Sequence, residues 1–337
     1  MVSQDSAAAV STIGRIASVV ADHGSADERA QAVLDELHTL IPFEAAEISC
    51  VNPLTGQIEE VAATGYSDEV LDGLRSQRFL DLMDLLGLQE SGRPIRMKDL
   101  PGDPLDNWAV SDLLIPAGYV EGMTMALRTP DGRFTGVLNL STTSTSHPSD
   151  IARDAVAQLC SALGTLTDPM RAGRWLAMLL GSGSTAVGLG TEGHVIPLPG
   201  IQAHPLLAEG SELMDLAVGT GTPGTWHSFI WDEPESWYRV RVVPCASDPH
   251  LQAIVSMDSV DVGPLSRREL EVLTLAAEGL SNGEIGDALV ISGRTVGSHI
   301  EHVLDKLCAP NRAAAVAHAI REGLLLGRVA RFDGPAR

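Results

Sequence analysis

The chain has 337 residues, of which 44% are hydrophobic and 20% charged, a composition typical of folded globular proteins rather than of disordered ones. This length is enough for two or three domains that each bury a core of their own. No apolar run reaches the roughly 18 residues of a membrane span, so we expect no membrane contact. The formal net charge is −21, which argues against a protein whose whole surface binds nucleic acid.

The acidic excess is confined to one part of the chain. From residue 264 onward basic and acidic residues balance, so the negative charge belongs to residues 1–263. A DNA backbone would repel that acidic part but not the neutral C-terminal part. The N-terminus contains Asp5 and no basic segment before its apolar stretch, so we expect no signal peptide and a cytoplasmic protein.

Cysteine and histidine spacing predicts neither a metal site nor another cofactor. The four cysteines lie far apart without a CxxC pair, which also argues against a disulfide framework: Cys50, Cys160, Cys245 and Cys308. Thiols without a chemical role and a redox-sensing thiol both remain open. No catalytic constellation is visible, and we expect no enzyme activity.

The first half of the chain predicts an α+β domain after an N-terminal helix at residues 1–24. Ser25, with Glu28 three residues later, forms a capping box for a second helix, which ends at Pro42. We then expect a hairpin around 52–56, helix over 67–90, loop over 91–108, a hairpin around 130–133 and helix over 147–174. Antiparallel hairpins between helices indicate the α+β class.

Three pieces of this region are similar to a GAF domain, a small-molecule sensing module: ADERAQAVLDELHTLIP, TGQIEEVAATGY and PDGRFTGVLNLS. The resemblance implies a GAF-like sensor domain over residues 25–172, with an unknown small-molecule effector bound between the sheet and the loop-rich side. By this analogy the ligand pocket is lined by residues around Trp108, Tyr119, Met123 and Met125. Ordinary core packing is the alternative role for each of these four.

Residues 175–262 predict a second sensor domain, with a short hairpin, one helix and three consecutive strands. The order resembles a PAS-like domain, and a shortened second GAF-like domain would look similar. In the strand WYRVRVVP, Val240 and Val242 alternate with Arg239 and Arg241, so we expect one face to contact water.

The segment from 265 to 325 contains four helical patterns in close succession. Ser266, Ser281 and Ser292 each stand at a helix start, and Glu269 and Glu284 follow the first two serines by three residues, the spacing of a capping box. The third pattern has an apolar stripe formed by Val296, Ile300, Val303 and Leu307. Only a few residues separate the second and third patterns, which predicts a helix-turn-helix at 281–307 within an all-α, four-helix domain at 263–328, followed by a tail at 329–337.

This segment resembles the DNA-binding domain of the LuxR/GerE family of bacterial transcription regulators in five consecutive pieces: LSRRELEVL, EGLSNGEI, ISGRTVGSHI, DKL and NRAAAVAHA. The resemblance implies binding to double-stranded DNA by the third helix. Helix geometry places polar residues at or beside the DNA groove, and we expect DNA contacts from Ser292, Arg294, Thr295, Ser298, His299, Glu301, His302, Lys306, Asn311 and Arg312.

Gly297 and Glu301 stand where the family often has basic or long polar residues, so we expect weak intrinsic DNA affinity, increased by homodimerisation. The beginning of the chain lacks a phosphorylatable receiver pattern and an early Trp/Tyr/Asp cluster, and the chain lacks a P-loop. These absences favour a one-component regulator with a GAF-like, small-molecule-sensing region. The alternative is a sensory or adaptor protein whose C-terminal domain contacts proteins rather than specific DNA.

Overall fold

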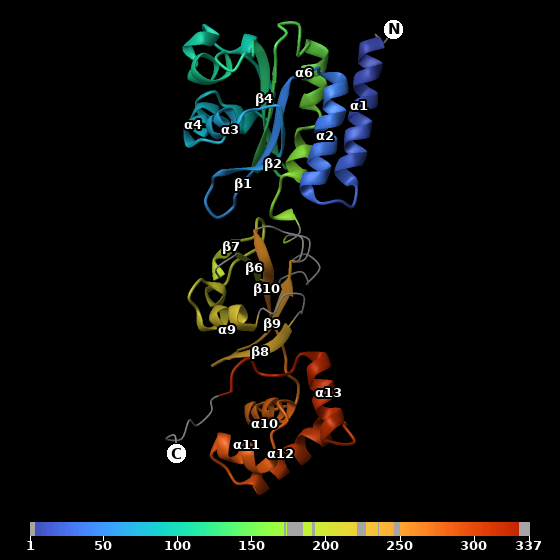
Figure 1. Cartoon of the computed structure of the whole chain (residues 1–337). Helices are drawn as coiled ribbons and strands as arrows, with labels where there is room; N and C mark the ends of the chain where they lie inside the picture. The colour runs from blue at the N-terminus through green and yellow to red at the C-terminus, as the bar shows by residue number, and fades with distance from the viewer. Residues whose placement is uncertain are drawn as a thin grey trace. The chain divides into compact units, whose positions relative to one another are not determined.

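The computed structural model describes residues 4–171, 173, 185–190, 193–220, 227–234, 236–245 and 250–329. The chain divides into two compact units, Met1–Arg171 and Ala172–Arg337 (Figure 1). The predicted tail from residue 330 on, and the end of the helix predicted for 147–174, lie outside the described residues. No described helix is both long and apolar enough to cross a membrane.

The first unit contains an antiparallel five-stranded sheet in the order β2-β1-β5-β4-β3. Its strands are β1 (Ala45–Val51), β2 (Ile58–Thr64), β3 (Ile95–Arg96), β4 (Glu121–Arg128) and β5 (Phe134–Thr142). The two predicted hairpins are β1–β2 and β4–β5. The strand β5, last in sequence, pairs with β1, which brings the two hairpins side by side.

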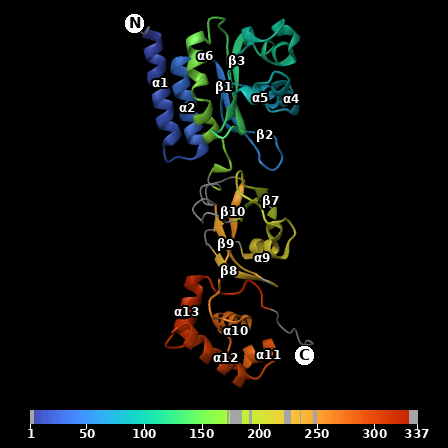
Figure 2. The ribbon, with the colours of Figure 1, turned by 180° about the vertical axis from the view of Figure 1, so that it is seen from behind.

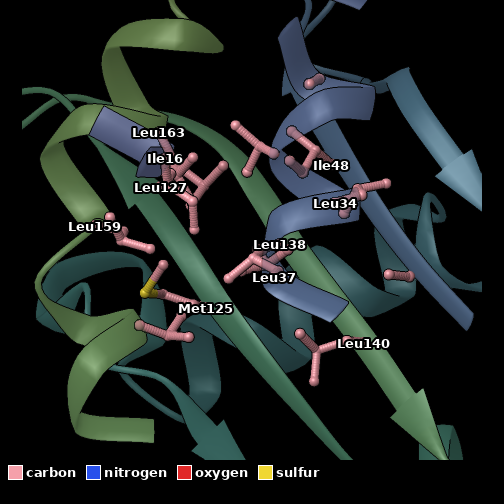
Figure 3. Packing of buried hydrophobic residues seen from close by; sticks show 14 of the residues in the cluster. Ile16, Leu34, Leu37, Ile48, Met125, Leu127, Leu138, Leu140, Leu159 and Leu163 are labelled. Carbon is pink, nitrogen blue, oxygen red and sulfur yellow. The ribbon is translucent and has the colours of Figure 1, made fainter. Parts of the chain in front are cut away.

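Four helices cover one face of this sheet: α1 (Gln4–Ala21), α2 (Ala26–Leu40), α6 (Asp150–Ala157) and α7 (Cys160–Leu166) (Figures 1 and 2). Ser25 and Glu28 form the predicted capping box of α2. Leu34, Ile48 and Leu138 meet in the core beneath these helices (Figure 3). Burial of such side chains stabilises the unit by roughly 1.5–3 kcal/mol each.

The single helix predicted for 147–174 is broken between α6 and α7. Gln158 and Leu159 are the residues at this break, where they form the end of α6 and the start of α7. After it, α7 lies so close to β4 that a Cβ on Gly164 would be 2.3 Å from the backbone of Arg128. Glycine is therefore required at this contact.

Short helices and loops cover the other face of the sheet: α3 (Asp68–Leu74), α4 (Gln77–Leu85), α5 (Leu88–Ser91), η1 (Met97–Asp99), η2 (Pro104–Asp106) and the π-helical turn η3 (Ala109–Leu114). Phe79, Met83 and Leu74 pack here against Ala126 and Val137 of the sheet. The strands β4 and β5 thus contribute alternate residues to two separate cores, as the pleat of a β-strand requires.

The second unit contains another antiparallel five-stranded sheet, in the order β7-β6-β10-β9-β8. Its strands are β6 (Thr185–Gly190), β7 (Val195–Pro197), β8 (His227–Glu233), β9 (Ser236–Pro244) and β10 (Leu251–Ser259). Counted from its own first strand, this sheet repeats the strand order of the first sheet. The helix α9 (Glu212–Thr220) and the turn η5 (Pro205–Leu207) cover one face.

Four helices follow: α10 (Arg267–Ala277), α11 (Asn282–Leu289), α12 (Gly293–Lys306) and α13 (Arg312–Glu322). The fold class is therefore as predicted, with α+β sheet regions followed by an all-α four-helix domain. The segment after α13 continues along the edge of the second sheet. Ile230 N donates to Leu325 O at 2.7 Å, and Gly327 N donates to Ile230 O at 2.9 Å.

The four helices and the second sheet also share side-chain contacts. Ile230 lies in one core with Leu270 and Leu326, and Arg267 Nη1 is 2.8 Å from Asp232 Oδ2. The expectation that one face of β9 contacts water is only partly right, because Arg239 and Arg241 are both half-buried.

Candidate DNA interface and ligand cavity

Local capping interactions define the turn between α11 and α12. Ser281 N donates to Glu284 Oε2 at 2.7 Å and Glu284 N to Ser281 Oγ at 3.4 Å, which is the predicted capping box. The helix α11 ends at Val290, whose φ of 55° lies in the left-handed region. Gly286 permits the close turn, because a Cβ there would lie 2.6 Å from the carbonyl oxygen of Ile291.

The helix α12 begins at a serine cap and buries one apolar stripe. Ser292 Oγ accepts a hydrogen bond from Thr295 N at 3.0 Å, and the two hydroxyls are 2.8 Å apart. Val296 and Val303 are buried against the other helices, while Ile300 is half-buried. The stripe therefore faces the core, as its spacing predicts.

The opposite side of α12 is a polar face open to solvent. Arg294, Thr295, Ser298, Glu301 and His302 are exposed on it. His299 is half-buried beside this face. We call these six residues the polar face of α12. Together with the free amides at the N-terminus of α12, they provide donors and acceptors of the kind that contact phosphates and base edges.

Lys306 lies at the end of α12 and is engaged within the protein. Its Nζ lies 2.8 Å from Oε1 and 2.7 Å from Oε2 of Glu269, on α10. Burial of Glu269 raises the pKa of its carboxyl, but the hydrogen bonds from Lys306 and Ser266 outweigh burial and hold that pKa below the ordinary value. This ion pair fixes the far end of α12 to α10.

Arg312 and Asn311 likewise have partners inside the domain. Arg312 Nη1 donates to Asn282 Oδ1 at 3.1 Å, and its Nη2 donates to the carbonyl oxygens of Leu280 and, at 3.5 Å, of Ala276. Asn311 Oδ1 caps α13 by accepting from Ala314 N at 2.9 Å. The ten predicted contact residues thus separate into the polar face with its Ser292 cap, and three side chains that hold the helices together.

The first unit contains a cavity of about 60 Å³ between the sheet and its cover of short helices. Apolar side chains from α3, α4, α5 and η3 form most of its wall, Phe79 and Met83 among them. On the sheet side, Thr124 of β4 and Asn139 and Ser141 of β5 line it.

The four predicted pocket residues do not come together around this cavity. Met123 forms part of the cavity wall, but it is also buried in the same helix-covered core as Met125, on the opposite face of the sheet (Figure 3). Trp108 stacks under Arg78, with the guanidinium carbon 4.1 Å from the ring centroid. Tyr119 packs edge-on against Tyr66, with ring centroids 5.6 Å apart. Neither ring is part of the cavity lining.

The polar lining residues were not predicted, although the sequence contains a signal for them. Asn139 and Ser141 alternate with apolar residues in the strand FTGVLNLST, so they lie on the same face as Val137. Both are buried. Polar residues on a buried strand face indicate either hydrogen bonding within the core or a bound molecule.

Comparison with known proteins gives a match for the C-terminal helices. Residues 263–319 match the family model of the bacterial regulatory proteins of the luxR family, GerE. The transcriptional regulatory protein DegU of Brevibacillus brevis is 46% identical over 59 residues, which are 18% of this chain and 25% of that protein. LiaR of Bacillus subtilis is 46% identical over 61 residues, 18% of this chain and 29% of that protein. The match therefore spans between a quarter and a third of these relatives.

Two solved structures are similar to larger parts of the chain. The GAF domain of a phosphoenolpyruvate-protein phosphotransferase from Coxiella burnetii is 16% identical, covers 50% of this chain and 98% of its own, and has a TM-score of 0.38. SdiA in complex with octanoyl-rac-glycerol is 17% identical, covers 92% of this chain and 93% of its own, and has a TM-score of 0.35. With TM-scores below 0.5, these two similarities support no conclusion about the function of this chain. Through residues 263–319, the chain contains a helix-turn-helix domain of the luxR family of bacterial regulatory proteins.

Proposed function

We propose that the chain is a one-component transcriptional regulator that binds double-stranded DNA through α12. The observation that carries this proposal is the polar face of α12, which is exposed beside a serine-capped helix N-terminus while the apolar stripe holds the helix in place. A helix of this form fits the major groove, with its N-terminal residues nearest the base edges. The luxR-family match over the same residues supports the assignment.

Within this proposal, the contact residues have different roles. Arg294, Thr295 and Ser298 are the direct DNA contacts, and Ser292 contributes the helix N-terminus to a phosphate. His299, Glu301 and His302 contact base edges or flank them. The other three residues, Lys306, Asn311 and Arg312, hold α12 and α13 in place through hydrogen bonds within the domain. They contact phosphates only through N–H groups that make no such bond.

We further propose that the protein acts as a homodimer. The helix α13 has Ala313, Ala317 and Ile320 exposed at spacings of four and three, which places them on one helix face. Ile320 has 59% of its surface exposed. A second copy of α13 would cover this apolar strip, and the small alanines permit a close approach. Two α12 helices would then read two half-sites about one DNA turn apart.

The proposed effector site is the cavity in the first unit. The region 25–172 is then the GAF-like sensor, residues 175–262 a second sensor-like domain and residues 263–328 the DNA-binding domain. A mostly apolar cavity with a few polar groups is the usual form of a small-molecule site. Of the pocket residues expected from the sequence, Met123 lines this cavity, and Trp108 and Tyr119 support its cover and rim.

A second candidate, an adaptor whose C-terminal domain binds protein, is favoured by one observation. Lys306 is paired with Glu269, and Glu301 adds a negative charge to the polar face. Both features reduce attraction to phosphates. The regulator predicts that DNA binding depends on the DNA sequence, whereas the adaptor predicts no preference for any DNA sequence.

Fluorescence anisotropy with DNA from the protein's own upstream region distinguishes these functions. The regulator predicts binding that weakens steeply with salt. It also predicts a loss of at least tenfold for the variant Arg294→Ala/Ser298→Ala, because two contacts are removed. An Arg93→Ala variant, which removes an exposed cation of the first unit, serves as control. Equal, weak binding to every DNA tested, unchanged in the double variant, would support the adaptor.

A further inference from the structure

The segment that follows α13 joins the second sheet to the helices. Residues 324–328, which we call the C-terminal strap, lie beyond residues 263–319, which match the luxR family. The backbone of Ile230, in the edge strand β8, makes two hydrogen bonds to the strap, of 2.7 and 2.9 Å. Within the strap, Leu326 N donates to Thr274 Oγ1 of α10 at 3.0 Å. One short segment is therefore bonded both to strand β8 and to helix α10.

The apolar stripe of α12 lies in two different cores. Val296, in the first turn of the helix, is buried with residues of α10 and α11. Val303, about two turns later, is buried in another core with Leu270 of α10, Ile230 of β8 and Leu326 of the strap. Among the described residues, the second sheet thus contributes buried side chains to the core at the C-terminal half of α12 and none to the core at its N-terminal half.

Ile230 and Leu326 fill the space between the sheet and the helices. Ile230 is 1% exposed and Leu326 is 6% exposed. Truncation of a side chain this buried leaves a cavity that the surrounding residues close only in part. Because Val303 belongs to the same core, a cavity at Ile230 would weaken the support of the C-terminal half of α12, while Val296 would keep its contacts.

Two ion pairs also connect the sheet domain with the helices and the strap. Arg267 Nη1 of α10 lies 2.8 Å from Asp232 Oδ2 of β8, and the Asp232 side chain is only 6% exposed. A carboxylate this buried is destabilising when its cation is removed. Arg328, at the end of the strap, pairs with Glu212 of α9, and its guanidinium carbon lies 4.5 Å from the ring centroid of Trp231. The contact therefore has a defined geometry on both sides of β8.

We propose that the second sheet positions the DNA-reading helix, with Ile230 as the positioning residue. The shared core fixes the C-terminal half of α12 and, through it, the direction of the helix axis in the DNA groove. Arg294, Thr295 and Ser298, the direct contacts in the function proposed above, lie in the N-terminal half. A loosened C-terminal half would change their orientation without removing any of them. The effect on DNA rests on that proposed function, whereas the shared core does not.

Hydrogen exchange of the full chain without DNA tests the shared core. Ile230→Ala should speed the exchange of α12 amides around Val303 by about tenfold, and should leave those around Val296 unchanged. Ile230→Val keeps most of the side chain and should restore wild-type exchange. The matched control is Leu213→Ala, which removes as many carbon atoms from the core that α9 forms with the second sheet. It should leave both halves of α12 unchanged.

DNA binding by the same full-length variants tests the positioning. The measured quantity is the ratio of two affinities, one for the motif that the wild type selects and one for an unrelated duplex. Ile230→Ala should lower this ratio about tenfold, as much as the loss of one good base contact. The slope of affinity against salt should stay the same, because no cation is removed. Ile230→Val and Leu213→Ala should keep the wild-type ratio. A smaller folded fraction alone would lower both affinities equally and leave the ratio unchanged.

Asp232→Asn tests the same contact without a cavity, and so also covers the case in which Ile230→Ala does not fold. The substitution keeps the size of the side chain and removes its charge attraction to Arg267. It should lower the affinity ratio by about threefold, because the docking is weakened while the core stays filled.

Three outcomes would overturn the inference. They are unchanged exchange around Val303 in Ile230→Ala, equal changes in Leu213→Ala, and a wild-type affinity ratio in both Ile230→Ala and Asp232→Asn. Failure of the proposed regulator gives a different result: the wild type then shows no sequence preference, while exchange around Val303 still depends on Ile230. That result would remove the regulator and leave the shared core in place.

Discussion

Glu269 accepts hydrogen bonds from two parts of the helical domain. Both of its carboxylate oxygens bind Lys306 Nζ, at 2.8 and 2.7 Å, and Oε2 also accepts from Ser266 N at 2.7 Å. One carboxylate therefore completes the capping box of α10 and anchors the end of α12. The carboxylate is almost fully buried, while the Lys306 side chain is about one-third exposed.

This carboxylate makes the helical domain sensitive to acid. The folded-state pKa of Glu269 is depressed below 4.5, so its stabilising contribution is present above that pH and is lost as the pH falls through the folded-state pKa. We expect hydrogen-exchange protection of α10 and α12 to fall in this acid range. In Glu269→Gln the acid-dependent loss should be smaller, and protection at neutral pH should already be reduced. Equal acid sensitivity in the two proteins would show that Glu269 has no such role.

Arg294 and Arg312 should behave differently when truncated. Arg312→Ala leaves the carbonyls of Leu280 and Ala276 without their side-chain donor, and should lower the free energy of unfolding by about 1–3 kcal/mol. Arg294→Ala, at an exposed site, should change stability by less than about 0.5 kcal/mol. It should instead reduce the slope of DNA affinity against salt by about 1. Denaturant unfolding and salt titrations measure the two effects; equal stability losses would contradict this division.

Val290 is a strained residue in the helix-turn-helix. A β-branched residue at φ 55° is rare, and the left-handed conformation costs about 1–2 kcal/mol. Its side chain is 67% exposed, so replacement loses little packing. Val290→Asn and Val290→Gly should therefore raise the thermal midpoint of the helical domain. Val290→Thr keeps the branched Cβ and should not. If Val290→Asn and Val290→Gly both lowered the thermal midpoint, the claim that Val290 is strained would be wrong.

Gly297 weakens α12 and leaves room for a side chain. A Cβ at this position would have no neighbour closer than 3.8 Å, the distance to Asn282 Nδ2. Gly297→Gln should raise stability by up to about 1 kcal/mol through helix propensity alone. Gly297→Lys should give a similar gain and also steepen the salt dependence of DNA binding by about one phosphate contact. Identical salt slopes for the two variants would place this residue away from the DNA backbone.

The segment that follows α13 packs against the second sheet at Gly327, where there is no room for a side chain. A Cβ on Gly327 would lie 2.5 Å from the ring of Phe229. Gly327→Val should therefore detach this segment and increase hydrogen exchange in β8, where Ile230 N donates to Leu325 O. Gly219→Val, at an exposed position of α9 where no atom lies within 4 Å of the Cβ position, is the control for the loss of a glycine in this unit. Unchanged exchange in β8 would show that the contact is dispensable.

Local patterns explain why so much of the helical domain was predictable. The capping boxes at Ser266 and Ser281 depend on residues three apart, and both are present, as is the one at Ser25 in the first unit. The stripe on α12 is likewise a local spacing. The pairing of Lys306 with Glu269 joins residues that are distant in sequence, and no local pattern specifies it.

The cavity was less predictable for a related reason. Met125 and Thr124 are neighbours in sequence, but the strand pleat sends them to opposite faces of the sheet. Which face becomes the ligand side depends on where the helices pack, and this is a tertiary property. Trp108 was expected at the pocket by analogy with GAF domains, yet its ring stacks under Arg78 instead of lining the cavity.

Selection of DNA from a random library by the full chain tests the central claim most directly. If the polar face of α12 reads DNA, the wild-type protein should enrich one motif, with two half-sites whose centres lie about 10 base pairs apart when it binds as a dimer. The variant Arg294→Ala/Thr295→Ala/Ser298→Ala, which changes only exposed residues, should lose this motif while it remains folded. Enrichment of the same motif by the variant, or of no motif by the wild type, would contradict the account.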